Sequence, residues 1–381
     1  MSETAAELSA IDYVHTGPGT LAGRFLRLYW QPVFIAADLP TGRAMPVRIL
    51  NEEFTLFRGE SGRAQLLAPR CAHRGTLLST GRVLGDRLQC FYHGWTYDSS
   101  GQCVDQPAEQ RGFADKVCIR SYPTREYLGL IFGYFGEGEP PPLPHFSAFD
   151  QEGYILAAVS KRPWNFFSQL ENSVDEVHIN FVHRASGFTS AGLNAAIPVI
   201  TGEETDYGIA RFGTRGNEVR RSHILMPNCM FSMVYEDHTG WTEHLAWRVP
   251  IDDVTHASFM VDLVHKTGAA REEFLARHRQ AQEDLAKLPS YESVLTEILA
   301  GRMTLADVAD RPDIVTLQDG VALRAQGAIP DRKNDRLAAS DRQVALLRRI
   351  WTRELHALSE GRPLKTWRWP ADVAVTTGVS T

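Results

Sequence analysis

The chain has 381 residues, of which 43% are hydrophobic and 23% are charged, and its formal net charge at pH 7 is −6. This composition is typical of a globular protein with room for two domains, and the negative charge gives no reason to expect binding to nucleic acid or an anionic membrane. The acidic N-terminus lacks the basic flank and apolar run of a signal peptide, and no apolar stretch could span a bilayer. We therefore expect a cytoplasmic protein.

The first part of the chain predicts a small β domain behind a short helical segment. Residues 1–45 are assigned to that segment, because residues 17–32 read as a turn followed by an amphipathic helix. From residue 46 to residue 140, β-branched and aromatic runs alternate with Gly-, Asp- and Pro-containing turns, which indicates an antiparallel all-β domain. A Pro-rich run follows, and its stiffness favours a domain boundary there.

Residues 141–381 predict a second domain of mixed α and β structure, so the fold class is α+β. We expect helices over residues 172–183 and 272–299, with strands between residues 197 and 265. A final helix is expected to begin at Ser340, through a capping box with Gln343, and to end at Gly361. Its core-facing stripe is formed by Val344, Leu347, Trp351, Leu355 and Leu358.

Two short Cys/His pairs form the first candidate metal site. The paired residues are Cys71 with His73 and Cys90 with His93. Two thiolates on one iron and two imidazoles on the other would make a Rieske [2Fe–2S] cluster. Zinc fingers usually place both cysteines before both histidines, so the alternating order favours the cluster over zinc. The three other cysteines are expected to be buried apolar residues, and an odd total argues against a disulfide framework.

The surrounding residues carry a resemblance to a known family. His73-Arg-Gly follows the first cysteine, and Tyr92-His93-Gly94-Trp95 surrounds the second histidine. This block resembles the Rieske domain of aromatic-ring oxygenases, which are Rieske non-haem iron enzymes. The family usually has proline where this chain has Ala72 and Phe91, and because neither is a ligand we expect only small changes in loop rigidity.

A second candidate metal site lies in the next domain. Asp175 and His178 are three residues apart and share a face of a regular helix, whereas His183, five residues beyond His178, does not. The helix must therefore end or bulge between the two histidines, and we place the irregularity near residues 180–182. Two histidines and a carboxylate make the facial triad of Fe(II) oxygenases. The motif resembles the family's Asp-x-x-His-x4-His element, which implies that His178 and His183 bind a mononuclear iron.

The third ligand must come from farther along the chain. The candidates are Asp313, Asp319, Asp331, Asp335 and Asp341. Asp319 is preferred, because its Gln-Asp context resembles phthalate-type members of the family. The resemblance also implies that Asp175 links a cluster histidine of one subunit to an iron histidine of its neighbour, in a homotrimer or a multiple of trimers. Asn172 is expected to be a further neighbour of the iron.

Together these motifs predict the terminal oxygenase component of a multi-component enzyme. By resemblance it activates O2 at Fe(II), with electrons from the cluster, to hydroxylate, dihydroxylate or O-dealkylate an aromatic acid or aryl ether. Electrons would come from NAD(P)H through a separate reductase, with or without a ferredoxin, because the one Gly-rich candidate for nucleotide binding, residues 133–138, opens no helix. The alternative is a Rieske electron-transfer protein without oxygenase activity, which would not need the second site. Arg162, Arg211 and Arg248 are either substrate-carboxylate partners or structural residues.

Overall fold

The structure, a computed structural model, describes residues 11–377 except residues 185–191, 194 and 237–238. Residues 1–10, which carry most of the stretch considered above as a signal peptide, lie outside this range. Among the described helices, none combines the length and the apolar character needed to cross a bilayer.

The N-terminal segment contributes one helix and one strand. Helix α2 (Leu21–Arg27) is capped by Thr20, whose side chain accepts a hydrogen bond from the backbone N–H of Gly23. Strand β1 (Gln31–Ile35) pairs with β11 (Leu130–Gly133), which also pairs with β10 (Thr124–Tyr127). The strands therefore begin before residue 46, because the apolar run of β1 completes a sheet with residues about a hundred positions later.

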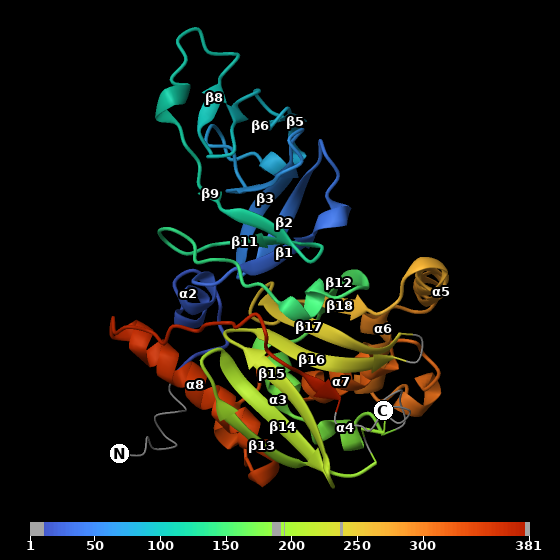
Figure 1. Cartoon of the computed structure of the whole chain (residues 1–381). Helices are drawn as coiled ribbons and strands as arrows, with labels where there is room; N and C mark the ends of the chain where they lie inside the picture. Colours follow the sequence, from blue (N-terminus) through green and yellow to red (C-terminus); the bar gives the residue numbers. More distant parts are fainter. Residues whose placement is uncertain (1–10, 185–191, 194, 237–238, 378–381) are drawn as a thin grey trace.

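Two further antiparallel sheets complete the upper part of the molecule (Figure 1). One has the order β2 (Ala44–Ile49), β3 (Glu52–Arg58), β4 (Ala64–Leu67) and β9 (Ser121–Tyr122). The other has the order β5 (Arg82–Leu84), β6 (Arg87–Gln89), β7 (Thr96–Tyr97) and β8 (Cys103–Asp105). The antiparallel β region predicted from sequence is confirmed.

The lower part of the molecule is built on one eight-stranded antiparallel sheet. Its order is β12 (Tyr154–Arg162), β18 (His256–Val264), β17 (Gly240–Pro250), β16 (Cys229–Glu236), β15 (Glu218–Leu225), β14 (Gly208–Arg215) and β13 (Val199–Glu204), and β19 (Thr376–Thr377) pairs with β15. The helices are α3 (Phe166–Val174), α4 (His178–Phe181), α5 (Gly268–Lys287), α6 (Tyr291–Leu299), α7 (Ile314–Ala325) and α8 (Arg342–Ser359). The α+β fold class is confirmed.

Three helix predictions need correction. Residues 272–299 form parts of two helices, because Pro289 lies between α5 and α6. Residues 172–183 are not continuous, since α3 ends at Val174 and α4 is a single turn. The final helix begins at Arg342, and in place of the capping box predicted at Ser340, the Asp341 carboxylate accepts the N–H of Ala338. Its predicted end is confirmed, because Gly361 has a φ of +68°.

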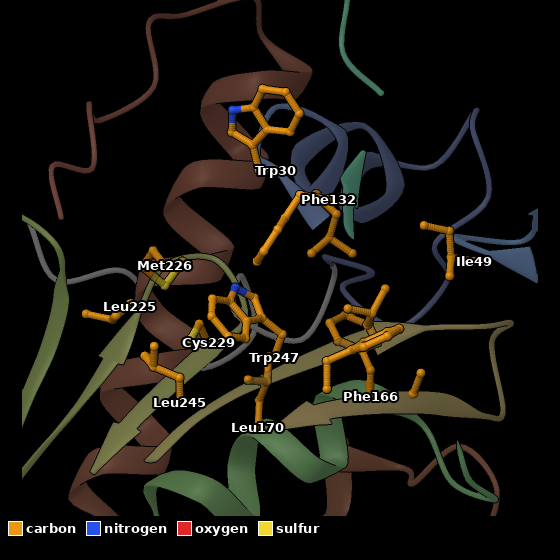
Figure 2. Packing of buried hydrophobic residues seen from close by; sticks show 14 of the residues in the cluster. Trp30, Ile49, Phe132, Phe166, Leu170, Leu225, Met226, Cys229, Leu245 and Trp247 are labelled. Carbon is orange, nitrogen blue, oxygen red and sulfur yellow. The ribbon is translucent and has the colours of Figure 1, made fainter. Parts of the chain in front are cut away.

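The two faces of the large sheet have different roles. On one face, Trp247 of β17 packs edge-on against Phe132 of β11, with ring centroids 5.4 Å apart (Figure 2). This contact joins the large sheet to the upper β region. On the other face, Arg248 lines a cavity together with residues of α3 and α7. Successive strand residues point to opposite faces, so the sheet separates a structural side from the side that holds the candidate site.

Candidate metal centres

The two Cys/His pairs lie on loops with the same backbone hydrogen bonds. The N–H of Cys71 donates to the carbonyl of Thr76, and the N–H of Gly75 donates back to Cys71, both at 2.9 Å. In the second loop, the N–H of Cys90 donates to Trp95 at 2.8 Å and Gly94 donates back at 3.1 Å. Both glycines have a φ of +74°, a left-handed conformation that glycine adopts without strain.

The four side chains converge in the way that a two-iron cluster requires. Cys71 and Cys90 are both buried, and their thiols lie within hydrogen-bonding reach of each other. The imidazole rings of His73 and His93 are 4.5 Å apart and lie nearer the surface than the sulfurs. A pair of thiols on the inner side and a pair of imidazoles on the outer side fits the two thiolates and two imidazoles of a Rieske cluster.

A buried tyrosine holds the first loop. The Tyr97 hydroxyl accepts the N–H of Ala72 at 3.0 Å, and its oxygen lies 3.2 Å from the sulfur of Cys71. Burial raises the pKa of Tyr97 well above its ordinary value, so the hydroxyl keeps its proton and can donate it to a thiolate at Cys71. Hydrogen bonds to sulfur tune the potential of iron–sulfur clusters. Sequence reasoning did not single out Tyr97.

The candidate iron ligands come together in space from two distant parts of the chain. His178, His183 and Asp319 offer ligand atoms that all lie within 4.8 Å of one another. Oδ1 of Asp319 is 3.1 Å from Nε2 of His183 and 3.8 Å from Nε2 of His178. That oxygen is buried without a hydrogen-bond partner of suitable geometry. Two imidazole nitrogens and a carboxylate oxygen that face one another in this way fit a divalent iron.

The remaining candidates for the third ligand lie elsewhere. Asp313 pairs with Arg311 at 2.8 Å, and Asp341 caps the turn before α8. Asp331 and Asp335 are exposed. Of the predicted carboxylates, Asp319 alone joins the two histidines within the described residues.

The break between α3 and α4 sets the direction of His178. Oδ1 of Asp175 accepts the N–H of Val177 at 2.8 Å, so the carboxylate caps the new turn rather than continuing the helix. Its second oxygen lies 3.8 Å from Nδ1 of His178. Helix α4 then ends at Phe181, which agrees with the predicted irregularity near residues 180–182 and lets His183 turn toward His178.

Two side-chain amides hydrogen-bond the candidate ligands of the mononuclear iron. Oε1 of Gln318 is 2.8 Å from Nδ1 of His183, which holds that nitrogen as the donor, so Nε2, which faces Asp319, is the nitrogen that would bind a metal. The side chain of Asn172 hydrogen-bonds the Asp319 carboxylate, consistent with its predicted place near the iron. Sequence analysis used Gln318 only as part of the Gln-Asp context and gave it no role.

The electrostatics favour an ionised carboxylate between imidazoles. Burial opposes ionisation of Asp319, but the adjacent imidazoles of His183 and His178 hold its pKa below the ordinary value. Burial lowers the pKa of His178, which favours the neutral imidazole that binds metals. For His183, burial is outweighed by the Asp319 carboxylate, and the pKa is raised.

A cavity of about 120 Å³ adjoins these ligands and is rich in arginine. Glu176 is fully buried beside it and pairs with three arginines. Burial would raise the pKa of Glu176, but these charges hold it at about 2. The arginines are Arg211, Arg215 and Arg220. Arg211 is therefore a structural residue, and Glu176 is a feature that sequence analysis missed.

Arg248, which also lines the cavity, has a different environment. Its Nη1 donates to the Ser258 hydroxyl at 2.8 Å, and its Nε is buried without a partner. No carboxylate forms an ion pair with it among the described residues. Burial, with a smaller contribution from the nearby charge of Arg162, lowers the pKa of Arg248 to about 10, so it stays protonated at neutral pH. Arg162 itself packs over the rings of Trp164 and Tyr291.

The remaining cysteines differ from expectation at one position. Cys103 and Cys229 are buried, as predicted, but Cys118 is exposed. All five cysteines are free of disulfides.

Comparison with known proteins identifies related families. The model of the Rieske [2Fe-2S] domain matches residues 29–123. The chain is 30% identical over 369 residues to the 5,5'-dehydrodivanillate O-demethylase oxygenase subunit of Sphingobium sp. strain SYK-6, covering 92% of this chain and 80% of that protein. It is also 30% identical to the phenoxybenzoate dioxygenase subunit alpha of Ectopseudomonas oleovorans, covering 90% of this chain and 84% of that protein.

A solved structure shares the fold. It is the terminal oxygenase of carbazole 1,9a-dioxygenase from Nocardioides aromaticivorans IC177, with a TM-score of 0.65 and 20% identity. The match covers 88% of this chain and 99% of that one. The likeness therefore extends through both the upper β region and the large sheet.

Proposed function

The chain belongs to the Rieske non-haem iron oxygenases, as an oxygenase (alpha) subunit of an aromatic-compound oxygenase, and from this premise we propose which residues do the work and what class of substrate they accept. The full-length relatives favour this function over an electron-transfer protein without oxygenase activity. We assign the [2Fe–2S] cluster to Cys71, His73, Cys90 and His93. We assign the mononuclear iron to His178, His183 and Asp319.

When bound, the mononuclear iron supplies open positions for O2 activation, and the cluster supplies an electron to it. The chain's own residues hold these groups in place. Gln318 fixes the tautomer of His183, and Asn172 orients the Asp319 carboxylate. His183 is buried and the other two ligands are largely covered, which limits the access of bulk water to the reacting centre.

We further propose that electrons pass between subunits through Asp175. The Rieske loops lie at the top of the molecule and the iron ligands lie in its lower part, so an electron would have to travel a long way within a single subunit (Figure 1). Phe91 and Tyr92, beside the cluster ligand His93, are 68% and 53% exposed, which fits contact with another protein surface. A homotrimer, or a multiple of trimers, would bring this tip to a neighbour's Asp175, which already lies beside His178.

Replacing Asp175 with asparagine tests the bridge. Asparagine still accepts the N–H of Val177, so the turn before α4 should survive, but the charge beside His178 is lost. We expect both metal centres to be retained and turnover to fall about 100-fold. Rapid mixing of the reduced enzyme with O2 and substrate should show slow oxidation of the cluster. Normal turnover with full iron content would rule out the bridging role.

We propose that the substrate is an aromatic acid whose carboxylate pairs with Arg248. The observation that carries this proposal is a buried, protonated arginine with an unpartnered Nε, lining the cavity beside the iron ligands. A buried cation without a carboxylate is costly until an anion pairs with it. Both full-length relatives are named for aromatic acids, dehydrodivanillate and phenoxybenzoate. An aryl ether that carries a carboxylate fits equally well.

The proposal is tested by a reductase-coupled O2-uptake screen that compares aromatic acids with their amides. The acids should support uptake, and Arg248→Met should raise KM for them roughly 10- to 100-fold while leaving KM for an amide nearly unchanged. Arg277→Met, at an exposed pair with Glu273, is the matched control and should have no effect. If the wild-type protein and Arg248→Met both used the acids and the amides equally well, the proposal that the substrate is an aromatic acid would be wrong.

A separate electron donor completes the proposed system. Gly133 ends β11, and the Gly-rich stretch after it opens no helix, so it lacks the context of a dinucleotide-binding turn. We propose that a reductase, with or without a ferredoxin, delivers electrons from NAD(P)H to the exposed tip around Tyr92.

A further inference from the structure

A partly buried histidine–carboxylate pair, away from the ligands and amides described above, lies on the large sheet. His244 of β17 and Asp262 of β18 are cross-strand partners, and Nδ1 of His244 is 2.7 Å from Oδ1 of Asp262. His244 is 9% exposed. Within the described residues no hydrogen bond involves Nε2 of His244, and that atom is not sealed in the core.

The register of the sheet places this pair on the same face as the cavity beside the iron ligands, next to residues that line it. Met230, Ser232 and Val234 of β16 line that cavity. Their cross-strand partners on β17 are Ala246, His244 and Thr242. Directly opposed residues in a sheet point to the same face, so His244 shares the face of the cavity lining.

Arg248, which lines the cavity, lies on the same face of the sheet. It lies four residues after His244 on β17, and alternate residues of a strand share a face. At about 3.3 Å per residue, the two positions are about 13 Å apart. This is the separation of the two Cα atoms, and because both side chains rise from the same face, a benzoate with an oxygen on its ring and a hydrogen bond of about 2.9 Å at each end has the length needed to join them.

The partner of His244 determines what its free nitrogen can bind. In the neutral imidazole, the N–H at Nδ1 donates to the Asp262 carboxylate, which leaves Nε2 as an acceptor. An acceptor pairs with a hydroxyl group, which has a proton to donate. A methoxy oxygen at the same ring position has no proton to donate, and an acceptor that the bound ring shields from water without pairing it lowers affinity.

We infer that His244 and Asp262 form the distal end of the substrate site and select aromatic acids that carry a free ring hydroxyl over the same acids with a methoxy group at that position. His244 is the specificity-determining residue, and Asp262 is a positioning residue that fixes its tautomer. The inference deepens the proposed function and rests on it, because Arg248 must hold the carboxylate for the ring oxygen to reach His244.

The test is calorimetric titration of the anaerobic holoenzyme with benzoate and with the ring isomers of hydroxybenzoate and methoxybenzoate. For at least one ring position, the wild-type protein should bind the hydroxy acid roughly fivefold to tenfold more tightly than the methoxy acid. In His244→Leu this ratio should fall to about one, with the affinity for benzoate itself unchanged. If the methoxy acids are rejected only because they are too large, the preference for the hydroxy acid should persist in His244→Leu. A persistent preference would therefore overturn the inference.

His265→Leu is the matched control. His265 also pairs with a carboxylate, Glu243, at 2.6 Å, but Glu243 neighbours His244 on β17 and therefore points to the opposite face. This variant should leave every affinity and every ratio unchanged. Should His244→Leu fail to fold, His244→Gln takes its place: its amide can donate to a methoxy oxygen as well as accept from a hydroxyl, so the ratio should again fall to about one, and an unchanged ratio would overturn the inference.

Two failures can be told apart. If benzoates bind through Arg248 but no ring position favours the hydroxyl, or the preference persists in His244→Leu, this inference is overturned and the acid specificity stands. If no benzoate binds, and Arg248→Met changes nothing, the acid specificity is wrong and the inference falls with it.

Discussion

Asp319→Ala is expected to remove the mononuclear iron and abolish turnover while leaving the Rieske cluster intact. Its Oδ1 is the atom on which Nε2 of both histidines converges, and the cluster loops lie at the far end of the chain. Iron should fall from about three to about two atoms per chain. The paramagnetic signal of the reduced cluster should be unchanged, because none of its ligands contacts the altered site.

The controls for this experiment are the carboxylates that compete with Asp319 as the third ligand. Asp313→Ala removes a salt bridge to Arg311, and Asp331→Ala removes an exposed turn cap. Both variants should keep about three irons and near-normal turnover. Retention of the third iron in Asp319→Ala, or its loss in either control, would show that the iron is held by a different carboxylate.

The cluster site could be predicted from the sequence because its geometry is local. Each loop closes within six residues, from Cys71 to Thr76 and from Cys90 to Trp95. Ligands that are close in sequence are therefore also close in space, and the motif spacing alone predicts that they converge. The two histidines of the second site are also close in sequence. Asp319 was found only because its neighbouring residues resemble those of relatives, since no periodicity links it to His178.

The surroundings of the iron ligands could not be predicted in the same way. Glu176 reads in sequence as a solvated helix residue, yet its three arginines come from β14 and β15. His244 and Asp262 meet only through the register of β17 and β18. Such contacts depend on strand order, which a single sequence does not provide. Asp175 was predicted to lie inside a helix. In the structure its carboxylate instead accepts the N–H of Val177 at the break between two helices, and the sequence alone does not distinguish these two positions.

The buried group around Glu176 gives the largest expected effect on stability. Glu176→Gln keeps the size of the side chain but leaves three buried arginines without their carboxylate. Removing one partner of a buried ion pair costs about 3–5 kcal/mol in the free energy of unfolding, which corresponds to a Tm lower by roughly 10 °C. Because Arg211 also donates to the carbonyl of Ser173, at the end of α3, the loop that carries Asp175 should loosen as well.

Glu204→Gln is the matched control for that variant. Glu204 also pairs with two cations, Arg353 and Lys365, but all three side chains are partly exposed. Solvent screens such pairs, so the loss should stay below about 1 kcal/mol. Thermal unfolding of the two variants at neutral pH compares a buried carboxylate with an exposed one that has the same kind of partners. Equal losses would mean that the arginines around Glu176 are satisfied without it.

The same group predicts how stability depends on pH. The arginines hold the pKa of Glu176 at about 2, below the ordinary value of 4.5 that the unfolded chain has. Because the folded state binds the proton less readily, the stabilisation is complete above about pH 5 and is lost as the pH falls from 4.5 toward 2. Glu176→Gln has no proton to take up there, so the gap in Tm between wild type and variant should narrow on acidification. A gap that is constant from pH 7 to pH 3 would show that the carboxylate contributes by packing rather than by charge.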